Sequence, residues 1–298
     1  MKRKLVKQGS ATMMISLPSK WVKNLNLKKG DEINLEEEGK NLIISSEGYS
    51  TKKELQISIN QNTESSIRTN IINAYRNGYD KLEIDFKDSK DYSLIVNILK
   101  NYLIGFEIIK REENKCVVEN ITEPSSNQFE ILFRKILYNI SSLIENTEER
   151  LKNKKEFKDY EEIVLKIHQY DNFCRRTVIK NNLIENQNLF WTFSTLLIHG
   201  QRELYHLNKF LDKNKINFNQ FDFYNSLKKI FNLLNEAYVN KDMLKIELIH
   251  RLEKEIIYKD FYNKIQKSSK NNVILFHIAL AIKNFYLASS PLIGLLRR

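Results

Sequence analysis

The sequence predicts a multi-domain chain with three successive parts, divided by changes in glycine and proline content and in hydrophobic periodicity. A short-strand part covers residues 1–48, a small α/β part covers 51–123, and an all-α part of about six helices covers 125–298. Gly and Pro punctuate the first fifty residues but are sparse after Pro124. A length of 298 residues suits two or three domains.

The first part has the pattern strand, strand, short helix, strand, strand. Pro18 stops the second strand and presets the backbone for a helix at residues 19–25. Gly30 suits a helix exit that requires positive φ, and Asp31 can hydrogen-bond back into the turn. The strands are expected at residues 4–7, 12–17, 32–35 and 41–45, with the last two joined around Gly39.

The middle part alternates between strand and helix patterns. Apolar residues at every second position predict strands, and the two helical stretches end at Gly78 and Gly105. No phosphate loop or catalytic pattern occurs, so the sequence predicts a small α/β layer without a readable function. Strands are expected around residues 55–59, 82–86, 106–111 and 115–121, with helices at 64–76 and 92–103.

The last part has the three-and-four apolar spacing of buried helices, as at Phe129, Leu132, Phe133 and Ile136. Six such helices would form two three-helix bundles. Their aromatic residues are better explained by a packed core or a dimer interface than by base stacking. The helices are expected at residues 126–153, 157–183, 187–212, 219–240, 243–268 and 271–294.

Positive charge is concentrated at the amino terminus. The chain carries a net charge of +11, and residues 1–30 contain no acidic residue. Clustered lysine and arginine favour a polyanionic partner, because binding releases counterions from a phosphate backbone. The basic residues of this stretch are Lys2, Arg3, Lys4, Lys7, Lys20, Lys23, Lys28 and Lys29.

Other features favour a soluble cytoplasmic protein. No apolar run approaches the roughly 20 residues of a transmembrane helix, and the first residues lack a signal-peptide core. Cys116 and Cys174 lie far apart and match no metal or redox spacing, so we expect reduced thiols. No nucleophile, base and orienting group occur at a recognised spacing, so we do not expect an enzyme.

The amino-terminal part combines a basic strand with a Gly-Ser turn, an apolar strand ending in Leu-Pro before a short helix with Trp, and a Leu-Lys-Lys-Gly-Asp turn. The stretches are Arg3-Lys4-Leu5-Val6-Lys7-Gln8-Gly9-Ser10, Met14-Ile15-Ser16-Leu17-Pro18-Ser19-Lys20-Trp21 and Leu27-Lys28-Lys29-Gly30-Asp31-Glu32-Ile33. Over residues 2–45 this combination closely resembles the SpoVT/AbrB family of swapped-hairpin regulators.

The resemblance implies that two chains interleave their hairpins into one all-β barrel, a dimeric DNA-binding domain. Four short strands and one short helix would indeed bury too little surface to be stable alone. Lysine lacks the bidentate fork that reads guanine, so we expect phosphate contacts to dominate, with modest sequence specificity. The positions that match the family's DNA face are Arg3, Lys4, Lys7, Lys20 and Lys23, with Ser10 and Thr12 able to hydrogen-bond phosphate.

The order of AbrB-like module, small middle domain and helical bundle is similar to archaeal phosphate uptake regulators, whose last part is PhoU-like. The PhoU family carries acidic Glu/Asp-x-x-x-Asp motifs that hold metal clusters. Residues 167–176 keep Asp171 but lack the carboxylate four positions earlier, and residues 251–260 have carboxylates at other spacings. Residues 278–291 contain no acidic residue. We therefore expect no cofactor and no metal site of the family type.

Two histidines are the remaining candidate metal ligands. His199 and His206 stand seven residues apart, with Glu203 between them, and would share one helix face. They would make only a partial site, and no other group with ligand spacing points to the same place. Exposed or core-edge histidines are the expected outcome.

These observations favour a homodimeric DNA-binding transcriptional regulator that is linked, by family resemblance, to phosphate uptake or phosphate signalling. Its expected partners are double-stranded DNA, a second copy of itself and a phosphate transporter or signalling protein, without membrane insertion. The alternative is a PhoU-type adaptor that regulates a transporter or sensor through protein contacts, with the amino-terminal module kept for dimerisation. Steep salt-dependent DNA affinity would distinguish the regulator from the adaptor.

Overall fold

The computed structural model describes residues 3–9, 12–38, 41–46, 52–59, 63–122, 126–153, 156–267 and 271–297. The chain forms two compact units, Met1–Lys52 and Lys53–Arg298. The second unit contains two hydrophobic cores, one in the α/β part and one in the helical part. A multi-domain layout with a small strand region followed by a largely helical part is therefore confirmed.

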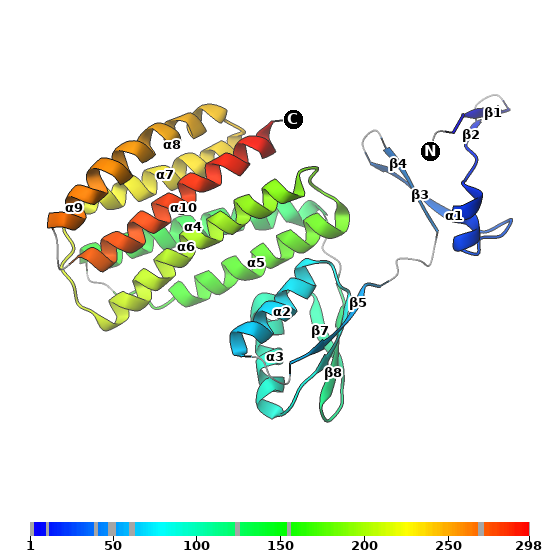
Figure 1. Cartoon of the computed structure of the whole chain (residues 1–298), viewed down its shortest axis with the longest axis horizontal. Helices are drawn as coiled ribbons and strands as arrows, with labels where there is room; N and C mark the ends of the chain where they lie inside the picture. The colour runs from blue at the N-terminus through cyan, green and yellow to red at the C-terminus, as the bar shows by residue number, and fades with distance from the viewer. Residues whose placement is uncertain are drawn as a thin grey trace. The chain divides into compact units, whose positions relative to one another are not determined.

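The first unit has the predicted order of strand, strand, helix, strand, strand (Figure 1). β1 and β2 form one antiparallel hairpin, and β3 and β4 form another, as separate two-stranded sheets. The second strand is shorter than predicted, since it ends at Met14 and not at residue 17. The elements are β1 Val6–Gln8, β2 Thr12–Met14, α1 Ser19–Asn24, β3 Ile33–Glu38 and β4 Asn41–Ser46.

The start of α1 at Pro18 agrees with the prediction from the sequence, whereas the end of α1 differs from it. Pro18 is the N-cap with φ −64°, and its carbonyl accepts from the amide of Val22 at 3.0 Å. The helix exit uses Asn26, at φ 52°, so the predicted exit at Gly30 is wrong. Gly30 adopts φ 100° in the following turn, where the Asp31 carboxylate accepts from the Lys28 amide at 2.7 Å.

No side chain that the structure describes in the first unit is buried. Seven of its large apolar side chains lie on the surface of the single chain, with exposed fractions between 43% and 65%. Short strands in two separate hairpins therefore do not enclose a core within one copy. These exposed apolar residues are Leu5, Val6, Met13, Met14, Ile15, Leu35 and Leu42.

The α/β part of the second unit is a four-stranded sheet with the order β5-β6-β8-β7. β5 and β6 are parallel and are joined through α2, whereas the other neighbouring pairs are antiparallel. All six elements lie close to their predicted positions. They are β5 Glu54–Ser58, α2 Glu64–Arg76, β6 Lys81–Asp85, α3 Ser89–Tyr102, β7 Phe106–Arg111 and β8 Lys115–Asn120.

Strict alternation along the strands explains this core. Leu82 and Ile84 are buried, and their ladder partners Val118 and Cys116 are buried beside them. Burial raises the pKa of the Cys116 thiol to about 11, so this thiol stays protonated near neutral pH. Both cysteines are buried and unbridged, which agrees with the expected reduced thiols.

The helical part closely matches the six predicted helices. The largest difference falls in the fifth, where the helix is interrupted by the π-helical segment η1 before it continues as α9. The elements are α4 Ser126–Asn153, α5 Tyr160–Asn181, α6 Gln187–Lys213, α7 Phe221–Asn240, α8 Met243–Glu255, η1 Ile256–Phe261, α9 Tyr262–Lys267 and α10 Asn272–Leu296.

The long helices pack as two groups that share one core (Figure 1). α4, α5 and α6 contact one another, and so do α7, α8 and α10, while α6 runs along α10 and joins the groups. Aromatic side chains fill this core, including the fully buried Phe190, Phe193, Phe223 and Tyr224. The expectation that the helical aromatics are structural is thus supported.

The last helix corrects one expectation from the sequence. By length and composition α10 is apolar enough to cross a membrane, although we expected no such run. Half of its most apolar window is buried inside the unit, against α6, α7 and α8. A helix at the centre of a helical core must be apolar on most sides, which accounts for the same composition.

Polar contacts hold the α/β part against α5. Arg176 is fully buried and donates to the backbone carbonyls of Tyr75 and Tyr79 at 3.1 and 2.6 Å. Its guanidinium also donates to Asp80 at 2.6 Å, and Lys180 adds a second donor to the same carboxylate at 2.5 Å. These charge-assisted bonds make the two parts one body.

Candidate functional site

The residues predicted to face DNA lie on the surface of the first unit. All those that the structure describes are exposed. Ser10 lies outside the described residues. Arg3 and Lys4 precede β1, Lys7 lies within it, Thr12 begins β2, and Lys20 and Lys23 lie on α1.

The five cationic side chains of this set share one electrostatic property. None forms an ion pair or a side-chain hydrogen bond with the part of the chain that the structure describes. Some lysines of the second unit are paired instead: Lys115 binds Glu83 at 2.6 Å and Lys228 binds Glu148 at 2.6 Å. The basic charge of the first unit is therefore not neutralised locally and remains available to an external polyanion. The five are Arg3, Lys4, Lys7, Lys20 and Lys23.

Asp171, the carboxylate kept from the acidic motif, is fully buried in an ion-pair cluster. Arg175 donates its Nε–H to Asp171 at 2.9 Å, and Arg76 donates from Nη2 at 2.9 Å, while Ser194 adds a hydroxyl donor. Burial opposes ionisation of Asp171, but the charges of Arg175 and Arg76 outweigh it and hold its pKa below the usual value. The Asp171 carboxylate therefore has a structural role in this ion-pair cluster.

Glu253 of the second acidic stretch, Glu203 and His206 also make local contacts. Glu253 is buried and accepts from Lys283 at 3.0 Å, whereas Glu203 lies 2.9 Å from the imidazole of His277. His199 is exposed, and His206 stacks near His277 with ring centroids 6.2 Å apart. Within the described ranges, no group of three or more His, Cys, Asp and Glu side chains could hold a metal ion.

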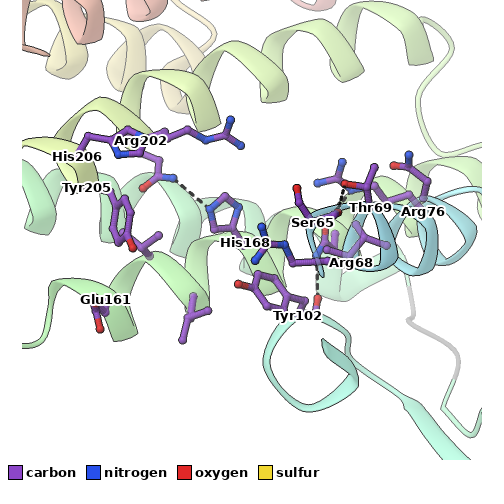
Figure 2. Close-up of a pocket in the computed structure, with 16 residues that line it drawn as sticks. Ser65, Arg68, Thr69, Arg76, Tyr102, Glu161, His168, Arg202, Tyr205 and His206 are labelled. Carbon is purple, nitrogen blue, oxygen red and sulfur yellow. Dashed lines mark hydrogen bonds between the residues drawn. The ribbon is translucent and has the colours of Figure 1, made fainter. Parts of the chain in front are cut away.

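A cleft of about 640 Å³ lies where the α/β part meets the helical part. Its walls come from α2 and the end of α3 on one side and from α5 and α6 on the other. Figure 2 shows His168 of α5 between Arg202 of α6 and Arg68 of α2, with Tyr102 beside Arg68. Arg76 also lines this cleft.

The electrostatic state of His168 reflects the charges around it. Burial is the largest effect, and Arg202, Arg76 and Arg68 add to it; together they lower the pKa of His168 to about 4, although Asp171 acts in the opposite direction. His168 is therefore neutral near pH 7. Three arginines from two helices act on one ring, so positive charge converges on this cleft.

The residues of this cleft were not predicted from the sequence. Arg68, His168 and Arg202 are separated by long stretches of chain, and no local spacing connects them. The available signal was weak, since α2 carries Arg68 and Arg76 and α6 carries the single arginine Arg202. The packing of α5 against both α2 and α6 brings these residues together.

One comparison with known families gives a match. Residues 6–52 match the family described as "Antidote-toxin recognition MazE, bacterial antitoxin". The match covers the first unit and does not extend to the α/β or helical parts. No curated protein and no solved structure matches the chain. The first unit is thus similar to MazE/AbrB-like domains, and none of the comparisons supports a PhoU assignment for the helices.

Proposed function

We propose, from the premise that residues 6–52 form a MazE/AbrB-like domain, that the chain is a DNA-binding transcriptional regulator that acts as a homodimer. The observation that carries the proposal is the combination, within one small unit, of unpaired basic side chains and uncovered apolar side chains. The first feature suits a polyanion, and the second suits a partner chain.

The proposed dimerisation rests on the exposed apolar side chains among the described residues of the first unit. Leu5, Val6, Met14 and Leu35 are each more than two-fifths exposed in a single copy, which is unfavourable for a unit of this size. A second copy of the same hairpins offers matching apolar surface and would form the barrel implied by the swapped-hairpin type. The proposed occupant of this apolar surface is therefore another copy of residues 1–52.

DNA binding follows from charge. Each copy brings eight Lys and Arg residues within residues 1–30 and no acidic residue there, and a symmetric dimer doubles this charge. Neutralising several phosphates produces affinity that falls steeply with salt concentration. We propose Arg3, Lys4, Lys7, Lys20 and Lys23 as phosphate contacts, with Ser10 and Thr12 as hydrogen-bonding positions.

The link to phosphate supply is a separate part of the proposal. It rests on the resemblance of the three-part domain order to phosphate uptake regulators. In this version of the proposal, the second unit senses phosphate supply and passes the signal to the DNA-binding unit. The MazE description of the matched family favours a second candidate, an antitoxin-like regulator whose remaining chain binds a protein. The 246 residues of Lys53–Arg298 form a folded unit with its own cores, which favours a signal-receiving domain over a short binding tail.

The test is fluorescence anisotropy of the full chain with labelled duplex DNA across a salt series. The variant carries Lys4→Ala, Lys7→Ala, Lys20→Ala and Lys23→Ala. The matched control removes four exposed lysines from the second unit through Lys87→Ala, Lys90→Ala, Lys100→Ala and Lys229→Ala. We expect tight wild-type binding with a steep salt slope, loss of both in the variant, and retention in the control.

Two outcomes would contradict the proposal. If the folded wild-type dimer does not bind duplex DNA at low salt, the adaptor or antitoxin-like candidate replaces the regulator. If both variants lose affinity equally, the amino-terminal surface is not the DNA face, because general charge would then explain the binding.

A further inference from the structure

We propose that the cleft between α2, α5 and α6 binds a small phosphorylated organic anion of about nucleotide size. The site belongs to the second unit alone. The inference goes beyond DNA binding and does not depend on it, because no residue of the amino-terminal module contributes to the cleft.

The charge balance of the cleft favours an anion. Among the described residues, no carboxylate forms an ion pair or hydrogen bond with Arg68 or Arg202, and Arg68 instead lies over the Tyr102 ring at 5.8 Å. Arg76 shares the single carboxylate of Asp171 with Arg175. Guanidinium groups bind phosphoryl oxygens through paired N–H donors, so each of these two arginines is able to bind a phosphoryl group of a ligand in the cleft.

The acidic residue that lines the cleft does not cancel this charge. Glu161 forms an ion pair with Lys209, which neutralises it. Glu203 lies one residue from Arg202 but faces His277. His168 is neutral, so it adds no charge and can act as a donor or an acceptor. The arginines therefore leave the lining with a positive excess.

A second observation points to a ligand. Gln201 lines the cleft and is fully buried, and its Oε1 has no hydrogen-bond partner among the described residues. Its Nε2 lies 3.5 Å from Nε2 of His168, at the limit of a hydrogen bond. A buried amide oxygen without a partner costs free energy unless a bound molecule supplies a donor. A hydroxyl or amino group on the ligand would supply it.

Size and wall chemistry favour an organic molecule over inorganic phosphate. A volume of about 640 Å³ falls in the usual range for small-molecule sites, whereas a phosphate ion would fill a small fraction of it. Ile72, Val164 and Leu165 provide apolar wall, and Tyr102 and Tyr205 provide aromatic rings. The lining therefore combines cationic groups for a phosphoryl group with apolar and aromatic surface for an organic portion.

The experiment is isothermal titration calorimetry on the full chain at constant ionic strength, with ATP and inorganic phosphate as the two probes. The variants are Arg68→Gln and Arg202→Gln, each tested separately. The control is Arg134→Gln, which removes an exposed arginine of α4 that does not line the cleft. The quadruple lysine variant of the amino-terminal module serves as a second control, because that module could bind ATP through charge alone.

We expect ATP to bind wild type, the arginine control and the lysine variant alike, and to bind each cleft variant about tenfold or more weakly, since each loses a charge-assisted contact. If inorganic phosphate binds more tightly than ATP and its affinity depends on Arg68 and Arg202 in the same way, the cleft is an anion site but the proposal of an organic ligand is overturned. Binding that disappears in the lysine variant, or that is unchanged in both folded cleft variants, would overturn the site. So would the absence of binding by either probe.

Discussion

Arg76 on α2 donates to the buried carboxylate of Asp171 on α5, with the two atoms 2.9 Å apart, and so connects the α/β part to the helical part. The same guanidinium donates its Nε–H to the side chain of Asn172 at 2.7 Å, and Asn172 donates in turn to the carbonyl of Tyr102 at 2.8 Å. One cluster thus fixes α2, α3 and α5 around the cleft.

Removing this carboxylate should destabilise the second unit strongly. Asp171→Asn leaves the buried Arg175 and the partly buried Arg76 without their shared counter-charge, so we expect a loss of about 3 kcal/mol in the free energy of unfolding. Urea denaturation measures it. The control is Glu247→Gln, which breaks the exposed pair with Arg251 and should cost less than about 1 kcal/mol. Equal losses in the two variants would contradict the interpretation.

Stability should rise with pH between about 4 and 6.5 because of His168. The folded protein keeps His168 neutral down to a pKa of about 4, whereas the unfolded chain binds the proton near 6.5. The unfolded state therefore binds more protons in this window, and stability falls as pH decreases through it. The groups facing the ring are Asp171, Arg68, Arg76 and Arg202, with the Tyr102 ring alongside.

Two measurements check this dependence. NMR titration of the His168 ring in the full chain should give a midpoint near 4. The variant His168→Gln should show a flatter dependence of the unfolding free energy on pH over the same window. A ring midpoint near 6.5 would show that His168 is neither desolvated nor affected by the three arginines.

The contact between α6 and α10 is close at Gly200. A Cβ added at Gly200 would overlap the ring of Phe285, which is fully buried, so the ring or the helices would have to shift. We expect Gly200→Ala to cost about 1–3 kcal/mol in thermal or urea unfolding, despite the higher helix propensity of alanine. At Gly294 the added Cβ would meet only the end of the flexible Leu189 side chain, so Gly294→Ala should be nearly neutral. A larger loss of stability in Gly294→Ala than in Gly200→Ala would be inconsistent with this packing.

Charges placed on the uncovered apolar surface should separate the proposed dimer. In the full chain, Val6→Asp combined with Met14→Asp puts a carboxylate on each of two cross-strand partners. We expect light scattering after size exclusion to report a dimer for wild type and a monomer for this variant. Ile109→Asp, at an exposed apolar position of β7, is the control and should remain dimeric. A monomeric wild type would remove the basis for the dimer.

The elements were largely predictable because each depends on local periodicity. α2, β7 and the long helices follow their apolar spacing, and their ends agree with the expected residues within a few positions. Two local details were not predictable. β2 ends at Met14 because it has a ladder partner only in the short β1, and the helix after Glu255 widens into a π-helical segment with no sequence signal.

The basic residues of the candidate DNA face could be named from the sequence because they are adjacent in the chain and their residue types alone carry the charge. The apolar α10 illustrates the opposite case, since its composition suits both a membrane span and a core helix. Half of its most apolar window is buried against neighbouring helices such as α6 and α7, and this burial depends on residues that lie far away in the chain.

The sequence by itself determined the order of helices and strands, the MazE/AbrB-like amino-terminal unit and the position of its charge, since periodicity and charge are local properties. Only the tertiary structure decided that Asp171 is an ion-pair partner of Arg76, and that Arg68, His168, Gln201 and Arg202 line one cleft. The physical reason is that a site formed between helices depends on which helix faces pack together. Many different spacings along a chain can bring the same set of side chains to one place, so the spacing alone does not reveal the site.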